Sequence, residues 1–323
     1  MRTLTAQYAR NGGIRIAVED LGGAGGSPLL LVMGLGTSRF WWPDGLVAEL
    51  VCRGFHVAAY DQRDAGQSTH LPAARRTGPP IAALLRRSTP AYTAEDLTDD
   101  AIAVLDHLGW RRAHVFGHSM GGLVAQRIAI RHPGRVLTVT TSAAVPSDAR
   151  GLGVLRHLHP APLVRFARLH YPATPEGDLG LAVALARILA APGQYIGADD
   201  VRDFVAKEAA HQVAGFRDDK AQSRQIGAKW SGGRLRRVAA PALILHGARD
   251  PLVRPSAARA IAAAVPTARL RILPDAGHFL SRDLWSLYAD EVYALAAGVS
   301  TGKAESSRRD RPGSTGSGRV SGI

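Results

Sequence analysis

The sequence predicts an α/β fold in which helices cover both faces of a mainly parallel sheet. Residues 29–33 and 56–60 are continuous apolar runs of strand length, as expected for strands that are buried on both faces. Runs with helical periodicity separate the strand-like runs, and such alternation is typical of parallel sheets. The chain has 323 residues, of which 46% are hydrophobic, so it can form one large core with an insertion.

Local patterns predict the elements of the first half of the chain. Residues 14–18 alternate between apolar and polar types directly after Asn11-Gly12-Gly13, which predicts an N-terminal β-hairpin. Residues 46–51 have a helical pattern between the two apolar strands. An amphipathic helix is expected over residues 93–108, where Thr93 can cap the N-terminus and Asp96 stands three positions later.

The second half of the chain contains an interruption. Residues 136–141 predict another strand, and strands and helices alternate again from 241 to 297. Between them, helical patterns cover residues 152–169, 179–189, 199–212 and 218–229. We therefore expect a core formed by residues 1–146 and 238–299, and a helical insertion over residues 147–237. Residues 300–323 are rich in Ser, Gly and Arg, which predicts a disordered tail.

The stretch Gly117-His118-Ser119-Met120-Gly121-Gly122 carries the main functional signal. A β-prone run precedes it and a run with helical pattern follows it. A serine at so tight a turn adopts a strained backbone, and side chains two positions away on either side would collide. Glycines 117 and 121 avoid that collision, so Ser119 is predicted to be the nucleophile of a strand–turn–helix elbow. An ordinary turn between a strand and a helix is the alternative.

Two later strand ends supply partners for this serine. An apolar run at residues 242–245 leads through a glycine turn to Asp250, and a run at 269–273 leads to His278. The order serine, aspartate, histidine is one of the known orders of a catalytic triad. Asp148, which follows the strand at 136–141, is a second candidate for the acid, although Asp250 fits a glycine turn after a strand better.

These residue types suit acyl transfer. A serine hydroxyl is a poor nucleophile at neutral pH, so His278 would accept its proton as general base. Asp250 would hold the imidazole in one tautomer and stabilise its protonated form. The oxyanion would need backbone donors, for which we expect the N–H groups of Met120 and Leu35, with Gly34 as the alternative to Leu35.

On these motifs the chain resembles the α/β-hydrolase superfamily over about residues 4–297. The segment Asp61-Gln62-Arg63-Asp64-Ala65-Gly66-Gln67-Ser68 is similar to the family turn D-x-R-G-x-G-x-S, with Asp64 where glycine is usual. That variant, together with Val32-Met33-Gly34 and His118-Ser119-Met120-Gly121, is similar to the aclacinomycin methylesterase type of actinobacterial esterases. The resemblance implies an eight-stranded α/β-hydrolase fold, with residues 147–237 as its lid.

Several residues are candidates to line a substrate pocket. We expect substrate contacts from Gly34, His118, Phe166, Tyr171 and Phe204, and weaker candidates are Leu163, Leu185, Tyr195 and Phe216. His118 would pack beside the site and take no part in catalysis. Asp64 or Gln67 could line the pocket, although Asp61 and Arg63 are more simply explained as residues that tie down a loop. Residues 72–90 read as a loop that could border the entrance.

The predicted function is hydrolysis of a carboxylic ester, which could be the methyl ester of a natural product. The same triad could serve a C–C bond hydrolase, a lactonase, an aminopeptidase or a perhydrolase. A ligand-binding sensor on the same fold is the non-enzymatic alternative. The partner would be a small-molecule ester.

Composition argues against several other classes of protein. The net charge is +13, but only four of the 40 basic residues are lysines and the arginines are spread along the chain, so we expect no nucleic-acid partner. The histidines lack ligand spacing, so neither a metal nor another cofactor is expected. The single Cys52, the absence of an apolar leader at the N-terminus and the lack of a long apolar run favour a cytoplasmic protein without a membrane span.

Overall fold

Eight strands form one sheet in the order β1-β2-β4-β3-β5-β6-β7-β8, in a computed structural model that describes residues 7–72 and 90–309. The strands are β1 (Gln7–Asn11), β2 (Ile14–Gly22), β3 (Ser27–Val32), β4 (Phe55–Tyr60), β5 (Ala113–His118), β6 (Val136–Ser142), β7 (Ala242–Gly247) and β8 (Ala268–Leu273). The β1–β2 and β2–β4 pairs are antiparallel, and every pair from β4 to β8 is parallel. The predicted α/β fold with a mainly parallel eight-stranded sheet is confirmed.

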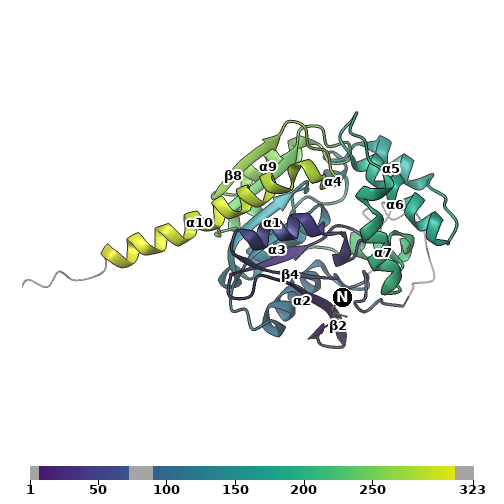
Figure 1. Cartoon of the computed structure of the whole chain (residues 1–323). Coiled ribbons are helices and arrows are strands. Elements are labelled where there is room, and N and C mark those ends of the chain that lie inside the picture. Colours follow the sequence, from purple (N-terminus) through teal and green to yellow (C-terminus); the bar gives the residue numbers. More distant parts are fainter. Residues whose placement is uncertain (1–6, 73–89, 310–323) are drawn as a thin grey trace, which may run out of the picture.

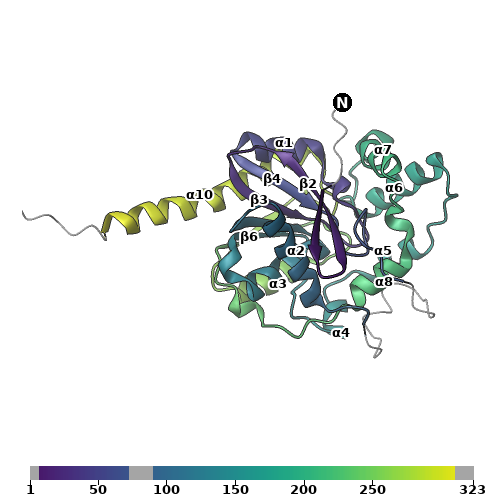
Figure 2. The same ribbon diagram turned by 90° about the horizontal axis from the view of Figure 1, so that it is seen from below.

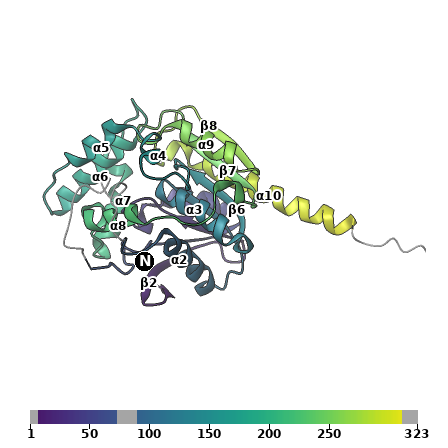
Figure 3. The ribbon, with the colours of Figure 1, turned by 180° about the vertical axis from the view of Figure 1, so that it is seen from behind.

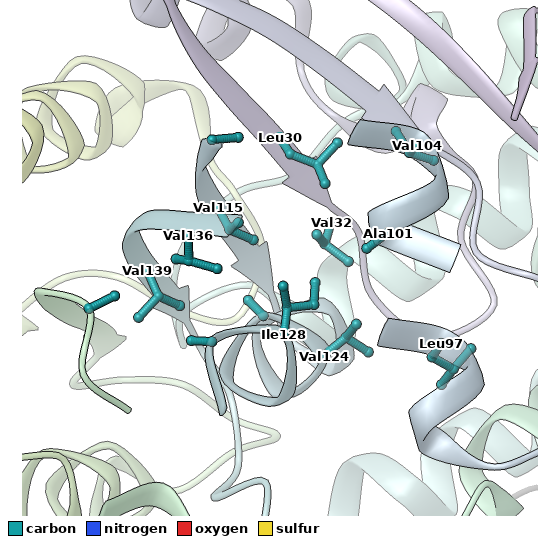
Figure 4. Packing of buried hydrophobic residues seen from close by; sticks show 14 of the residues in the cluster. Leu30, Val32, Leu97, Ala101, Val104, Val115, Val124, Ile128, Val136 and Val139 are labelled. Carbon is teal, nitrogen blue, oxygen red and sulfur yellow. The ribbon is translucent and has the colours of Figure 1, made fainter. Parts of the chain in front are cut away.

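Helices cover both faces of this sheet, as Figures 1 and 2 show. The side chains of β3 alternate between two cores. Leu29 and Leu31 join residues of α1 (Asp44–Cys52) and α10 (Trp285–Arg309). Leu30 and Val32 join residues of α2 (Ala94–His107), α3 (Met120–Arg131) and α9 (Pro255–Ala264), and part of this cluster is drawn in Figure 4. The central strands are therefore buried on both sides, as their continuous apolar sequences predicted.

The start of α2 agrees in detail with its sequence signal. The Thr93 hydroxyl accepts the N–H of Asp96 at 3.2 Å, and the Asp96 carboxylate accepts the N–H of Thr93 at 2.7 Å. This reciprocal capping box satisfies two backbone donors that have no partner within the helix.

The segment between β6 and β7 forms α4 (Leu152–Leu155), α5 (Pro160–Ala167), α6 (Pro175–Leu189), α7 (Arg202–Ala210) and α8 (Asp219–Gly227). We call residues 147–237 the inserted segment. In Figures 1 and 3 its helices α5 to α8 gather at one end of the sheet, and α10 projects from the other end. The helices therefore lie at the carboxyl ends of the strands, where β5 leads to Ser119.

The structure refines one expectation and corrects another. The helical pattern over residues 152–169 forms two separate helices, α4 and α5, because Pro160 lacks a backbone N–H and suits the first turn of a new helix. Residues 300–309 continue α10, where the composition indicated a disordered tail. Extending an existing helix costs little once it is nucleated, and Lys303, Ala304 and Glu305 are good helix formers. The loop expected over 72–90 lies, apart from its two ends, outside the described residues, as do residues 310–323 of the tail.

Candidate active site

The turn between β5 and α3 holds Ser119 in a strained backbone conformation. Its φ is 54° and its ψ is −120°, a combination that residues with a side chain rarely adopt. A Cβ on Gly117 would lie 2.2 Å from the carbonyl oxygen of Gly121, and one on Gly121 would lie 1.9 Å from that of Val32. Both glycines are therefore required sterically, and the turn presents the Ser119 hydroxyl at the carboxyl end of β5.

Three predicted residues meet at this point. His278 Nε2 lies 2.9 Å from Ser119 Oγ, and His278 Nδ1 lies 2.8 Å from Asp250 Oδ2. Asp250 follows β7 and His278 follows β8, so neighbouring strand ends bring them to the serine. His278 and Asp250 are 4% and 3% exposed, which leaves little water to compete for these hydrogen bonds. The arrangement can pass a proton from the hydroxyl to the imidazole.

Asp250 is held as a carboxylate. Its Oδ1 accepts the backbone N–H groups of Leu252 and Val253, each at 2.8 Å. Burial disfavours its charge, but the hydrogen bonds and the facing His278 outweigh burial and lower the pKa of Asp250. Nε2 of the buried His246 lies 3.5 Å from Asp250 Oδ2 and donates a hydrogen bond to the Val253 carbonyl at 2.9 Å.

His118 packs beside the imidazole of His278, with ring centroids 5.2 Å apart. Burial, helped by His278, lowers the pKa of His118 to about 3. The ring is therefore neutral at physiological pH and adds no positive charge next to the base. His118 also lines the cavity described below.

The loop after β3 approaches the serine closely. A Cβ on Gly34 would lie 3.3 Å from Ser119 Cβ. Gln62 Nε2 donates to the Met33 carbonyl at 2.7 Å, and the Thr37 hydroxyl donates to the Gly34 carbonyl at 3.0 Å. Leu35 directly follows these two anchored carbonyls. Met120 is the first residue of α3, where a backbone N–H has no partner within the helix. Both expected oxyanion donors therefore belong to chain segments that flank Ser119.

A cavity of about 1410 Å³ opens onto Ser119 and His278. All five residues predicted to contact substrate line it, and so do the weaker candidates Leu163, Leu185 and Phe216. Tyr195 does not line it and is 81% exposed, because it follows α6 in a surface turn. Much of the remaining lining is apolar, including Met33, Trp41, Leu123, Val145, Val154, Leu158, Leu181, Leu189, Ile226, Leu252, Phe279 and Leu280.

Other candidate residues lie away from this centre. Asp148 Oδ2 accepts the N–H of Leu235 at 3.4 Å, whereas the acid that contacts His278 is Asp250. Asp64 and Gln67 are absent from the lining of the cavity. Gln67 Oε1 accepts Arg39 Nη2 at 2.9 Å, and Asp64 pairs with Arg224. The interpretation of the 61–68 turn as a structural loop is the better one.

Sequence reasoning missed the polar groups that hold the site in shape. Thr37, Gln62 and the two backbone N–H groups that bind Asp250 are examples.

No group of three or more His, Cys, Asp or Glu side chains suited to a metal ion occurs in the described part of the chain. Within residues 7–72 and 90–309, none of the helices has the length and apolar character needed to cross a membrane.

Known proteins resemble this chain over most of its length. Residues 27–282 match the family model of the alpha/beta hydrolase fold. Rhodomycin D methylesterase DnrP of Streptomyces peucetius is 33% identical over 81% of this chain and 88% of its own length. Rhodomycin D methylesterase DauP of a Streptomyces strain is 31% identical over 81% of this chain and 88% of its own length.

Solved structures agree on the fold. The enol-lactonase of Burkholderia xenovorans superposes with a TM-score of 0.62 at 23% identity, over 90% of this chain and 100% of that chain. Because the family model matches most of the chain and the two Streptomyces relatives are at least 31% identical over 81% of it, the chain belongs to the α/β-hydrolase family.

Proposed function

We propose that this hydrolase cleaves carboxylic esters through an acyl-enzyme on Ser119. The observation that carries the proposal is the hydrogen-bonded path from Ser119 Oγ through the His278 imidazole to Asp250, with Ser119 and His278 lining the cavity. A nucleophile, a base and an orienting acid are the groups that acyl transfer requires.

In the first half of the reaction Ser119 Oγ attacks the ester carbonyl carbon, and His278 Nε2 takes the hydroxyl proton. The negative charge on the carbonyl oxygen is stabilised by the N–H groups of Met120 and Leu35. When the C–O bond breaks, His278 returns the proton to the leaving alcohol. Water then attacks the acyl-enzyme by the same route and releases the carboxylic acid and free Ser119.

The cavity favours a bulky apolar substrate. Its volume of about 1410 Å³ exceeds the range of about 300–1,000 Å³ that is usual for small-molecule sites. Aromatic and aliphatic side chains of the inserted segment, among them Phe166, Tyr171 and Phe204, face this space. Together with the names of the two Streptomyces relatives, this supports a methyl ester on a polycyclic natural product as the substrate, and the inserted segment as its lid.

Ester turnover tests the reaction class. Ser119→Ala should lower kcat/KM for a p-nitrophenyl ester at least ~10³-fold. Ser147→Ala is the matched control, since it removes a buried hydroxyl away from the cavity lining. A fluorophosphonate should label the wild type and the control but not Ser119→Ala. Retention of most activity in Ser119→Ala would end the proposal, and absence of labelling in the wild type would favour a binding protein.

Substrate size tests the assignment of the cavity. A methyl ester of a three- or four-ring aromatic carboxylic acid should give a higher kcat/KM than methyl acetate or methyl benzoate, because it buries more apolar surface. The matching primary carboxamide serves as the test of bond type, and it should turn over at least about 100-fold more slowly. Equal rates for the small and the large esters would contradict the assignment.

A further inference from the structure

The inserted segment contacts the three loops that carry Asp250, His278 and Leu35. Leu158 forms an antiparallel bridge with Val253, next to Asp250, and the His159 N–H donates to the Leu252 carbonyl at 2.9 Å. The Leu189 carbonyl, at the end of α6, accepts the N–H of His278 at 2.8 Å. The third contact, between α8 and the loop at residues 33–37 after β3, uses a buried side chain.

Gln225 on α8 makes that third contact. Its Oε1 accepts the N–H of Gly36 at 3.0 Å, and its Nε2 donates to the Arg63 carbonyl at 3.0 Å. The residue is 3% exposed, so both hydrogen bonds are shielded from water. Gly36 has a φ of 64°, and a Cβ there would lie 2.7 Å from Gln222 Cγ, so α8 packs directly on the backbone of the loop.

The position of Gly36 makes this contact relevant to Leu35. The Thr37 hydroxyl holds the Gly34 carbonyl, which belongs to the same peptide unit as the Leu35 N–H. Gln225 holds the N–H of the next peptide unit. A planar trans peptide places its N–H opposite its carbonyl, so the held Gly34 carbonyl sets the direction of the Leu35 N–H. Gln225 holds the peptide unit on the other side of the Leu35 Cα, and so restrains the backbone that carries this N–H.

An ion pair anchors α8 in turn. Arg224 Nε and Nη2 donate to the two oxygens of Asp64 at 2.8 and 2.7 Å, a bidentate pair in which the carboxylate is fully buried. Asp64 is the residue that stands where the family turn usually has glycine, and its φ of 63° explains that usual glycine. The departure from the family pattern thus provides the carboxylate that holds α8.

We infer that Gln225 is a positioning residue, through which α8 of the inserted segment aims the Leu35 N–H at the oxyanion. This rests on the proposed function, since it assigns a role within that reaction. Gln225 lines the cavity, but its amide oxygen is engaged by Gly36. It therefore acts through the loop, and the inserted segment takes part in catalysis as well as enclosing the substrate.

Gln225→Met tests this inference, because methionine keeps the length of the side chain and loses both hydrogen bonds. We expect kcat to fall about 10- to 100-fold, less than the 10²–10³-fold loss on removing an oxyanion donor itself. Affinity for an alkyl boronic acid, whose tetrahedral adduct on Ser119 carries the oxyanion, should fall by a similar factor. Substrate affinity measured in the Ser119→Ala background should change less than threefold when Gln225→Met is added.

Gln126→Met is the matched control. Gln126 is 2% exposed and likewise bridges backbone groups, since it accepts the N–H of Ser147 and donates to the Val145 carbonyl. Its replacement removes a comparable pair of hydrogen bonds on α3, away from the oxyanion loop. It should leave boronate affinity within threefold of the wild type even where it lowers Tm.

Gln225→Glu separates positioning from folding, and it also serves if Gln225→Met does not fold. It keeps the acceptor for Gly36, loses the donor to Arg63 and adds a buried carboxyl, so it should lower the stability of the fold while boronate affinity stays within about fivefold of the wild type. Unchanged boronate affinity in Gln225→Met would overturn the inference, as would an equal loss in folded Gln225→Glu and Gln126→Met. Ester turnover that survives Ser119→Ala would instead overturn the proposed function, so the two failures are distinguishable.

Discussion

His278 Nδ1 lies 2.8 Å from Asp250 Oδ2, while Asp250 Oδ1 accepts two backbone N–H groups from Leu252 and Val253. The carboxylate is therefore oriented from its own loop before it orients the imidazole. Because both N–H donors favour an acceptor, an amide in place of the carboxylate would turn its NH₂ group toward His278.

Asp250→Asn should lower kcat about 10³- to 10⁴-fold, because His278 would be held in the tautomer that cannot accept the serine proton. Steady-state kinetics with a p-nitrophenyl ester measures the loss. Asp148→Asn is the control, since Asp148 contacts Leu235 and not His278, and it should keep most of the activity. Full activity in Asp250→Asn would show that the acid has been wrongly assigned.

The close approach of β3 to α3 predicts an asymmetric response to added methyl groups. Gly121→Ala would place Cβ 1.9 Å from the Val32 carbonyl oxygen, so the elbow or the strand must shift. We expect a loss of at least about 3 kcal/mol in the free energy of unfolding, or failure to fold. Gly134→Ala, where nothing lies within 4 Å of the added Cβ, should change stability by less than about 0.5 kcal/mol. Urea denaturation checks both, and equal stability would refute the steric account.

How much of the structure can be predicted from the sequence depends on how far apart the interacting residues are along the chain. Sequence patterns predicted every strand of the sheet after the hairpin. The clearest were β3 and β4, which are largely buried and nearly continuously apolar, whereas the edge strand β8 alternates between exposed and partly buried residues. Ser119, Asp250 and His278 could be paired from the sequence because each follows a strand, and parallel strands end at the same edge of the sheet. The helix boundary at Pro160, inside the inserted segment, was not predicted, because helix propensity alone did not separate α4 from α5.

The side chains that support the site could not be predicted from the sequence, for a different reason. Gln225 and Gly36 are 189 positions apart in the chain. Gln225 lies in a polar helix, and the sequence pattern of that helix does not show which of its glutamines contacts another segment. Asp64 was noticed as a departure from the family turn, but its partner Arg224 is one of many arginines in a chain with net charge +13. Long-range pairs of common polar residues leave no local signal.

The Asp64–Arg224 pair predicts that a double change is less harmful than one of its parts. Arg224→Met leaves the carboxylate of Asp64 buried without its partner, which should lower the free energy of unfolding by about 3 kcal/mol. Adding Asp64→Gly removes that charge and relieves the φ of 63°, so part of the stability should return. Chemical denaturation of the two variants measures the difference. A double variant no more stable than Arg224→Met would contradict the buried-charge explanation.

Glu208 on α7 predicts a pH dependence of stability. Its Oε1 accepts the Ser38 hydroxyl at 2.7 Å and Trp41 Nε1 at 3.0 Å, which ties the inserted segment to the chain after β3. Burial raises the pKa of Glu208 to about 7. The negative charge of the nearby Asp61 also raises this pKa, whereas the hydrogen bonds from Ser38 and Trp41 lower it. Between the ordinary pKa of 4.5 and about 7, the folded protein thus keeps a proton that the unfolded chain has released.

Stability from this group is therefore fully present below about pH 4.5 and is lost as the pH rises through about 7. Glu208→Gln keeps the Oε1 acceptor without a charge, so its advantage over the wild type should grow across this range by on the order of 2–3 kcal/mol. Denaturation of both proteins at pH 5 and pH 8 gives the comparison, and the difference cancels the titration of all other groups. A difference that is constant with pH would show that Glu208 titrates normally in the folded protein.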